Sequence, residues 1–264
     1  MTRAATPSAH PAAFRPNWPA RLGWVLIVGY AVYAAASLDI SLPRLIKGMD
    51  HGAKFLAAMV PPDVSRLKLL GENLTESVEM AFIASAAGIL LALPIGLCAA
   101  RNLMPAWITW PARAFIAVCR SFHQVIFAIL FVKAVGFGPL AGILTLIFAS
   151  IGFIGKLFAE AIEEISLKPV EALRAAGAPF ASVLIFAVLP QVLSRFIGFC
   201  TYQMDSNLRN STMIGIVGAG GIGGTLFSAF QRYDYDFVAT ILIAIIALII
   251  VGEYISLKIK AVFQ

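Results

Sequence analysis

The clearest chemical pattern in this sequence joins a short charged stretch to an apolar group nine residues further on. Its members are Glu171, Ala172, Arg174, Gly177, Leu189 and Pro190. A small helix with one acidic and one basic residue, and a glycine turn behind it, is suited to docking in the groove of a soluble partner. The other interpretation is an ordinary amphipathic helix at a membrane surface.

A second group of polar residues interrupts an apolar region. It comprises Arg120, Ser121, His123 and Gln124. An ionisable group inside a membrane span is costly, so it usually faces a cavity or a partner, and we expect this group near the middle of a pathway. Arg120 would offer its guanidinium fork to an anion, or serve in gating or helix pairing. His123 is either a packing residue or a proton switch. Lys133 and Arg195 are expected at membrane interfaces.

The third pattern is a glycine run that matches the G-x-G-x-x-G dinucleotide fingerprint literally. Its glycines are Gly215, Gly218, Gly220, Gly221 and Gly223. The fingerprint needs a preceding β-strand, a following helix and an acidic residue about 20 positions on, within a soluble unit. Here the run lies between apolar stretches, so we interpret it as a re-entrant or broken segment in which backbones pack closely. A flexible external loop is the alternative.

Other chemistries lack their signatures in this sequence. Cys98, Cys119 and Cys200 are isolated, with neither metal-ligand spacing nor a disulfide framework. There is no G-x-x-x-x-G-K-[ST] loop for ATP, and no cluster of His, Asp or Glu at helical spacing in the apolar stretches. No dense Lys/Arg cluster marks a nucleic-acid groove. We therefore expect no enzyme, no metal or cofactor on this chain, and no nucleic-acid partner.

The elements that position these residues are membrane spans. Of the 264 residues, 60% are hydrophobic and 13% are charged, against roughly 45–50% and about 25% in an ordinary soluble domain. No charged residue occurs in 22–38, 80–100, 134–155 or 237–252. These lengths suit helices that cross a membrane, since about 20 residues span its hydrocarbon core. The fold class is therefore all-α and polytopic.

We predict six transmembrane helices, close to residues 22–38, 78–100, 112–135, 140–158, 184–204 and 237–257. Residues 1–20 contain four prolines and form an expected disordered tail, which leaves 21–264 as one membrane domain. A leader cleaved near Ala34-Ala35-Ala36 is the alternative to a retained first span.

Two segments between the spans are expected at membrane surfaces. We predict a helix–turn–helix over 160–187, because its prolines and glycine leave pieces too short to span. A shorter interfacial helix is predicted over 54–60, within the polar loop 39–79. An even number of spans places both termini on one side. We expect that side to be the cytoplasm, together with 160–187, and the loop 39–79 to be external.

The sequence resembles the permease subunits of ABC importers. The stretch from Glu171 to Pro190 is similar to their coupling motif, written E-A-A, three residues, G, nine residues, I-x-L-P, although Leu173 and Ala187 depart from it. The segments 131–139, 155–164, 189–192 and 214–223 narrow the resemblance to the phosphonate importer family, over about residues 72–258. Where that family typically reads Arg-Ser-x-Pro, His123 replaces the proline that would kink the helix.

The resemblance implies a type I ABC importer permease fold with a cytoplasmic coupling helix, in a bacterial inner membrane. It implies ATP-driven alternating access for a phosphonate or a reduced phosphorus oxyanion, phosphite or hypophosphite. The implied partners are a cytoplasmic ATPase dimer that binds ATP and Mg, a periplasmic substrate-binding protein, and a second permease copy, identical or homologous. A methionine-type amino-acid importer permease is the nearest alternative, and a membrane-embedded enzyme is the alternative from another class. The sequence leaves open which phosphorus compound is carried.

Overall fold

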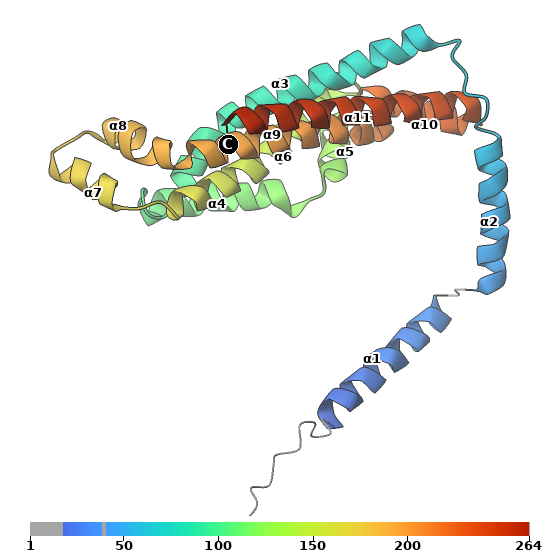
Figure 1. The fold of residues 1–264 in the computed structure, drawn as a ribbon, viewed down its shortest axis with the longest axis horizontal. Coiled ribbons are helices and arrows are strands. Elements are labelled where there is room, and N and C mark those ends of the chain that lie inside the picture. Colours follow the sequence, from blue (N-terminus) through green and yellow to red (C-terminus); the bar gives the residue numbers. More distant parts are fainter. Residues whose placement is uncertain (1–17, 39–40, 264) are drawn as a thin grey trace, which may run out of the picture. The chain divides into compact units, whose positions relative to one another are not determined.

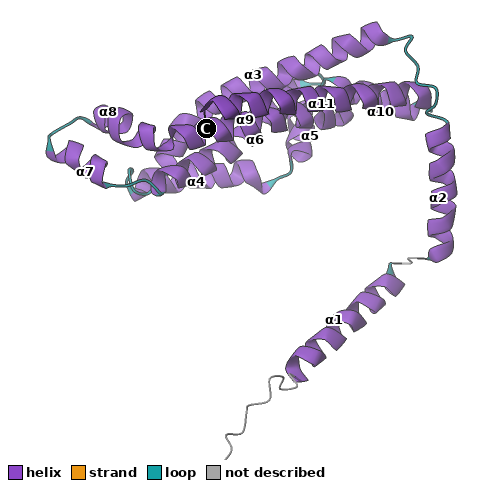
Figure 2. Cartoon of the chain, in the orientation of Figure 1, coloured by secondary structure: helices purple, strands orange, loops and turns teal. Residues whose placement is uncertain are grey.

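The computed structural model describes residues 18–38 and 41–263. These residues form helices joined by turns, with no strand among them (Figures 1 and 2). The chain divides into two compact units, Met1–Ala57 and Ala58–Gln264. The predicted all-α class is confirmed.

The first unit holds two helices, α1 over Trp18–Ser37 and α2 over Leu42–Ala57. The rise of α1 is about 30 Å, which matches the hydrocarbon core of a bilayer. Because α1 begins at Trp18, the predicted first span started four residues too late. The last three residues of the predicted tail therefore belong to a helix, and the rest of that tail lies outside the described residues.

Helix α2 is strongly amphipathic. Most of its large apolar residues recur at three- and four-residue intervals on one face: Leu42, Leu45, Ile46, Met49 and Leu56. The charged face carries Arg44, Lys47, Asp50, His51 and Lys54. The predicted interfacial helix over 54–60 was therefore wrong in its bounds, since the helical spacing begins at Leu42 and Pro43 suits the first turn.

The second unit is a bundle of long helices and short connecting ones. Its helices are α3 (Leu67–Ala99), α4 (Ala106–Ser121), α5 (Gln124–Val135), α6 (Pro139–Glu163), α7 (Lys168–Ala175), α8 (Phe180–Val183), α9 (Leu189–Ile214), α10 (Ile222–Gln231) and α11 (Tyr235–Phe263). A π-helix, Leu184–Val188, joins α8 to α9, and a 3₁₀ turn, Gly215–Val217, follows α9. In the described part of the chain, five helices are long and apolar enough to cross a membrane, or six if α4 and α5 form one broken span. The prediction of about six spans is confirmed on that count.

Two spans are built differently from the prediction. The third is broken, because α4 and α5 meet at an angle of 95°. The fifth is longer, because α8, the π-helix and α9 continue as one segment over Phe180–Val217. Pro190 falls in the first turn of α9, and the π-helix before it satisfies Leu189 N–H at Leu184 O, so the helix is not interrupted.

The predicted helix–turn–helix over 160–187 is consequently wrong at both ends. Residues 160–163 belong to α6, and residues 180–187 belong to the long segment that continues into α9. The helix between the two spans is α7 alone, with eight residues.

Helices α3 and α6 form the central pair of the bundle. A Cβ added to Gly96 of α3 would lie 2.9 Å from a ring carbon of Phe158 and 3.1 Å from Gly155 O of α6. A Cβ at Gly88 would overlap the side chain of Ser150. Small residues four apart, here Gly88, Ala92 and Gly96, allow membrane helices to approach closely and gain van der Waals contact. This seam fixes α6, on which α4, α5 and α9 also pack.

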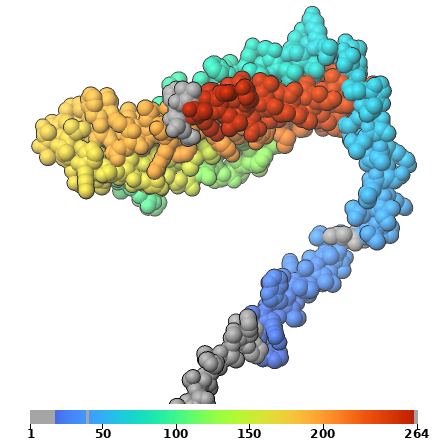
Figure 3. Space-filling view, in the orientation of Figure 1, coloured from blue at the N-terminus to red at the C-terminus, as the bar shows by residue number. Residues whose placement is uncertain are grey.

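The outer faces of the long helices are apolar. Ile243, Ile246 and Ile250 of α11 are all more than half exposed, and α11 forms part of the near face of the second unit in Figure 3. An exposed apolar stripe of this length suits hydrocarbon rather than water.

Candidate functional site

Helix α7 carries the predicted partner-docking residues. On its inner side, Val170 is 1% exposed and Leu173 is partly buried, and both pack on an apolar cluster formed by α6, the π-helix and the start of α9. Its outer side leaves Glu171, Ala172 and Arg174 exposed. The acid in the first turn and the base in the last turn both complement the helix dipole. The helix is thus fastened by one face while its charges point outward.

A Schellman motif ends α7. Gly177 N–H donates to Arg174 O at 3.0 Å, and Ala178 N–H donates to Leu173 O at 3.0 Å. Gly177 has φ +78°, a left-handed conformation that glycine adopts without steric penalty. An added Cβ would meet open space, so the backbone and not the packing requires glycine here.

Gln191 ties the turn before α7 to the start of α9. Its Oε1 accepts a hydrogen bond from Ser166 N–H at 3.0 Å, and its Nε2 donates to Ser166 O at 3.3 Å and to Ala187 O at 2.6 Å. Leu189 is partly buried in the same apolar cluster, and Pro190 is exposed. Sequence reasoning missed Gln191 as a functional residue, although its place directly after the Leu-Pro pair was a usable signal.

Two ion pairs lie at the end of α6 that leads into α7. Arg113 Nη2 lies 2.6 Å from Glu163 Oε1, and Arg195 Nη1 lies 2.6 Å from Glu164 Oε2. Arg113 also donates from Nε to Ala99 O at 2.9 Å. Arg113 therefore connects α3, α4 and α6, whereas Arg195 is an exposed residue that connects α9 to the turn before α7.

The predicted pathway residues lie at the break between α4 and α5. Phe122 has φ −117° and ψ 147°, and His123 has φ −65° and ψ 146°. This is the backbone that a proline at 123 would impose on itself and on the residue before it. His123 Nδ1 accepts a hydrogen bond from Val125 N–H at 3.4 Å and so caps α5. The kink that the family proline would cause is present without that proline.

Two of the four predicted pathway residues line a cavity. Arg120 and Ser121 line a cavity of ≈ 420 Å³ between α4 and α6, and His123 and Gln124 do not. Arg120 is exposed and forms no ion pair or side-chain hydrogen bond within the described residues. Gln124 Oε1 is buried and has no hydrogen-bond partner in that part of the chain.

The glycine run forms the tight reversal between α9 and α10. Its left-handed members are Gly218, Gly220 and Gly221, with φ of +87°, +82° and +76°. Gly221 N–H donates to Glu76 Oε1 at 3.1 Å, and Ile222 N–H donates to Ser77 Oγ at 2.9 Å, so α3 caps the start of α10. An added Cβ at Gly223 would overlap the backbone of α9. Without a strand before it in the described chain, the run lacks the context of a dinucleotide site.

Sequence reasoning also missed a buried polar network in the bundle. Asn207 of α9 is fully buried, and its Nδ2 donates to Ser85 Oγ of α3 at 2.9 Å and to Ser150 Oγ of α6 at 2.8 Å. Gln203 Nε2 donates to Asn207 Oδ1 at 2.8 Å. Polar groups in hydrocarbon need internal partners, so this network fixes three helices in register. The four-residue spacing of the two amides was the available signal.

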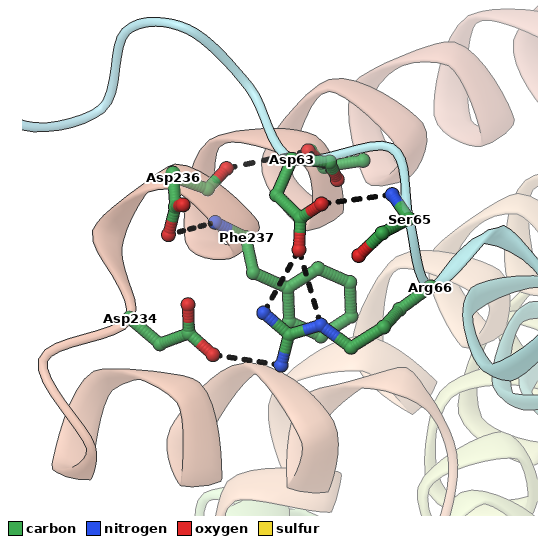
Figure 4. Close-up of polar contacts among 7 residues, drawn as sticks. Asp63, Ser65, Arg66, Asp234, Asp236 and Phe237 are labelled. Atoms are coloured by element: carbon green, nitrogen blue, oxygen red, sulfur yellow. Dashed lines mark hydrogen bonds and ion pairs between the residues drawn. The ribbon is translucent and has the colours of Figure 1, made fainter.

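An arginine cluster closes the other end of the second unit, where α3 and α11 begin. Figure 4 shows the Arg66 guanidinium between two carboxylates and over an aromatic ring. Its Nη2 donates to Asp63 Oδ2 at 2.9 Å, its Nη1 lies 2.7 Å from Asp234 Oδ2, and its Cζ lies 3.9 Å from the Phe237 ring centroid. The cluster ties the loop before α3 to the first turn of α11.

Hydrogen bonding within this cluster moves its pKa values apart. Hydrogen bonds from Ser65 and then from Arg66 lower the pKa of Asp63 to about 2. The hydrogen bond from Arg66 lowers the pKa of Asp234, and the hydrogen bond to Asp234 raises the pKa of Arg66. The cluster therefore stays fully charged at neutral pH.

Known proteins similar to this chain are membrane transport components. Residues 92–259 match the family described as "Binding-protein-dependent transport system inner membrane component". The chain is 38% identical over 240 residues to the phosphite transport system permease protein PtxC of Stutzerimonas stutzeri, covering 89% of this chain and 87% of that protein. It is 39% identical over 233 residues to the phosphate-import permease protein PhnE of Mycolicibacterium smegmatis, covering 88% of this chain. The match spans only 44% of that longer relative.

More distant similarity reaches methionine transporters. The chain is 27% identical over 154 residues to the methionine import system permease protein MetP of Bacillus subtilis, covering 53% of this chain and 69% of that protein. Among solved structures, an inward-facing MetNI methionine ABC transporter chain matches with a TM-score of 0.67 at 24% identity, over 76% of this chain and 99% of that one. At this identity the match shows the fold alone.

Proposed function

This chain belongs to the binding-protein-dependent transport system inner membrane component family, and on that premise we propose that it is the permease subunit of an importer for phosphonate or a related phosphorus oxyanion. The observation that carries the substrate class is the 38% identity to a phosphite transport permease over 87% of that protein. Phosphite, hypophosphite, phosphate and small phosphonates share a tetrahedral, anionic phosphorus group, and one pathway could pass any of them.

A permease for methionine is the second candidate. It is supported by the fold match and by 27% identity to a methionine permease, over little more than half of this chain. Two phosphite permease relatives are 38% and 33% identical to this chain and each covers 89% of it, which favours the phosphorus oxyanion.

The proposal places ATP hydrolysis on a separate cytoplasmic ATPase, which would bind ATP and Mg. Helix α7 is the surface proposed to couple the two proteins, because it is anchored by Val170 and Leu173 while Glu171 and Arg174 remain exposed. Ala172 and Gly177 would complete the contact. Leu189 and Pro190 would support the helix from behind, with Leu189 in the shared apolar cluster.

The proposed assembly also contains a second permease copy, identical or homologous, and an external substrate-binding protein. In this arrangement α7 is cytoplasmic, and the arginine cluster at Arg66 faces outside. In a cysteine-free variant, Lys168→Cys should resist an impermeant thiol reagent applied to intact cells, and Asn73→Cys should react. Labelling of Lys168→Cys from outside would reverse the orientation.

Uptake into proteoliposomes tests the transport function. The permease, its ATPase and its binding protein would be reconstituted together, with labelled phosphite, methylphosphonate, phosphate and methionine as separate substrates. We expect ATP-dependent uptake of at least one phosphorus oxyanion and none of methionine. Uptake of methionine alone would establish the second candidate instead.

A further inference from the structure

A groove between α4 and α6 is lined by four charged side chains. The charged residues that line it are Arg113, Arg120, Lys156 and Glu160. Arg113 is bound at Glu163, the last residue of α6. Along the axis of α6, Lys156 lies about 10 Å from Glu163 and Gly152 lies about 16 Å from it. Arg120 lies over Gly152. The groove therefore runs from the α7 end of α6 toward its middle.

The three cations of the groove are held to different degrees. Arg113 is fixed by Glu163 at 2.6 Å and by Ala99 O at 2.9 Å. Lys156 Nζ lies 3.4 Å from Glu160 Oε1, and both side chains are 45% exposed, so this pair is long, solvated and easily exchanged. Arg120 has no carboxylate partner in the described residues. Arg113 is thus structural, whereas Lys156 and Arg120 are available to a ligand.

Arg120, the deepest of these charges, is unsuited to a lipid-facing surface. Charged side chains at membrane depth face water-filled cavities or protein partners, because hydrocarbon does not solvate them. The groove is large enough, at ≈ 420 Å³, to hold a small anion together with water. A cavity with two available cations on opposite walls favours anions over cations and neutral solutes.

We propose that Arg120 and Lys156 form a weak oxyanion site on the cytoplasmic half of the pathway, and that Glu160 is the carboxylate that competes for Lys156 and releases the anion. The guanidinium of Arg120 would bind two oxygens of a tetrahedral anion, and the Lys156 ammonium would bind a third. A transport site must bind weakly enough to let its ion leave, and Glu160 supplies the repulsion that this requires. The identity of the anion as a phosphorus oxyanion rests on the proposed function.

The charge preference of the groove can be measured without transport. Ala117 lines the groove and is exposed, so Ala117→Cys in a cysteine-free permease, assembled with its ATPase in nanodiscs, reports on it. We expect an anionic methanethiosulfonate to react faster than a cationic one, and added phosphite to slow the reaction. Lys156→Met should lower the anionic-to-cationic rate ratio about threefold or more and weaken the phosphite protection.

A matched control exists in α2, which belongs to the first compact unit. Lys54 forms the same kind of four-residue-spaced pair, with Asp50 at 2.6 Å. Lys54→Met should leave the rate ratio and the protection unchanged. An unchanged ratio and unchanged protection in Lys156→Met would overturn the site.

Transport then tests the role of each group. Lys156→Met should lower phosphite uptake about tenfold, and Lys156→Arg, which keeps the charge, should restore most of it. Glu160→Gln should slow uptake while strengthening phosphite protection of Ala117→Cys, because release is impaired. Co-purification of the ATPase verifies assembly. If Lys156→Met does not assemble with the ATPase, the Lys156→Arg and Glu160→Gln variants test the site instead. Faster phosphite uptake together with weaker phosphite protection in Glu160→Gln would overturn the proposed role of Glu160 in releasing the anion.

The proposed transport function and the proposed anion site can be contradicted independently. Wild-type protein that moves no phosphorus oxyanion but keeps the charge preference would contradict the proposed function and retain the anion site. If the wild-type protein takes up phosphite and Lys156→Met takes it up equally well, the proposed function is retained and the anion site is overturned.

Discussion

Gly152 of α6 lies directly beneath the side chain of Arg120. A Cβ built on Gly152 would be 2.9 Å from Arg120 Cγ and 3.0 Å from Cys119 Cβ. Gly152→Ala should therefore displace the end of α4, with an overpacking cost of about 1–3 kcal/mol, and should lower phosphite uptake by moving Arg120. Thermal unfolding and uptake would be measured together. Gly155→Ala is the control, because its added Cβ would lie at an ordinary 3.4 Å from Ile116 Cδ1. Equal behaviour of the two variants would contradict the prediction.

Reversal of charge on α7 should uncouple the ATPase. Glu171 is exposed and forms no part of the apolar anchor, so Glu171→Arg should fold and insert normally. We expect uptake to fall at least about tenfold, with loss of substrate-stimulated ATP hydrolysis. Glu72→Arg, an exposed acid at the other end of the bundle, should retain both activities. Normal stimulation in Glu171→Arg would remove α7 from the coupling surface.

Loss of Gln191 should loosen α7 without unfolding the bundle. Gln191→Ala removes three hydrogen bonds that fasten Ser166 and Ala187, each worth about 1 kcal/mol. We expect a small decrease in thermal stability and a larger fall in transport per ATP hydrolysed. Hydrogen exchange should rise at Ser166 and the neighbouring turn. Unchanged exchange there would show that the apolar anchor of α7 suffices.

His123 should be replaceable by proline. The backbone at 122–123 already has the φ and ψ that proline prefers, and a proline at this position would break the helix where His123 now caps it. We expect His123→Pro to keep uptake within about twofold of wild type, with the same dependence of uptake on pH from about 5.5 to 8. A pH dependence that disappears in His123→Pro would instead assign His123 a proton-switch role.

The arginine cluster at the start of α3 should make a constant contribution to stability above acid pH. The pKa of Asp63 is lowered to about 2, and that of Asp234 is also lowered. A depressed carboxyl pKa stabilises the folded state above the ordinary Asp value of about 3.9, and this contribution is lost as the pH falls toward the folded value. Arg66→Met should lower the Tm by a few degrees at pH 5 to 8 and by progressively less below about pH 4. Arg232→Met, at an exposed arginine nearby, should show no such pH profile. If the Tm of Arg66→Met were lower than that of wild type by the same amount from pH 3 to pH 8, the stability would be lost because Arg66 no longer packs over the Phe237 ring.

The sequence was sufficient to predict the number and approximate positions of the membrane spans, because charge-free runs of membrane length are difficult to accommodate in a water-soluble fold. It was insufficient for the path of the chain near prolines. Pro190 read as an interruption, yet a π-helix before it and a first-turn position in α9 let the helix continue. The break at Phe122 and His123 has no proline or glycine, so local composition does not mark it.

The candidate site was only partly visible in the sequence. Glu171, Arg174 and Gly177 could be recognised because they occur together in one short motif. Sequence reasoning did not identify Lys156 or Glu160 as site residues, since only the packing of α4 on α6 places them in one groove with Arg120. Contacts between distant segments depend on tertiary packing, and a single sequence does not record them.

Helix α6 joins the two proposed functional surfaces through one uninterrupted rod. Its 25 residues carry Gly152 in the middle and lead directly to the turn that precedes α7. A tilt of about 10° about its α7 end would sweep Gly152 through about 3 Å, given the rise of roughly 16 Å between Glu163 and Gly152. Because the Arg120 side chain packs on Gly152, this tilt of α6 would also move the Arg120 guanidinium. Helix α6 therefore has the geometry of a lever that would convert motion at the proposed ATPase surface into displacement of Arg120, the cation proposed to bind the anion.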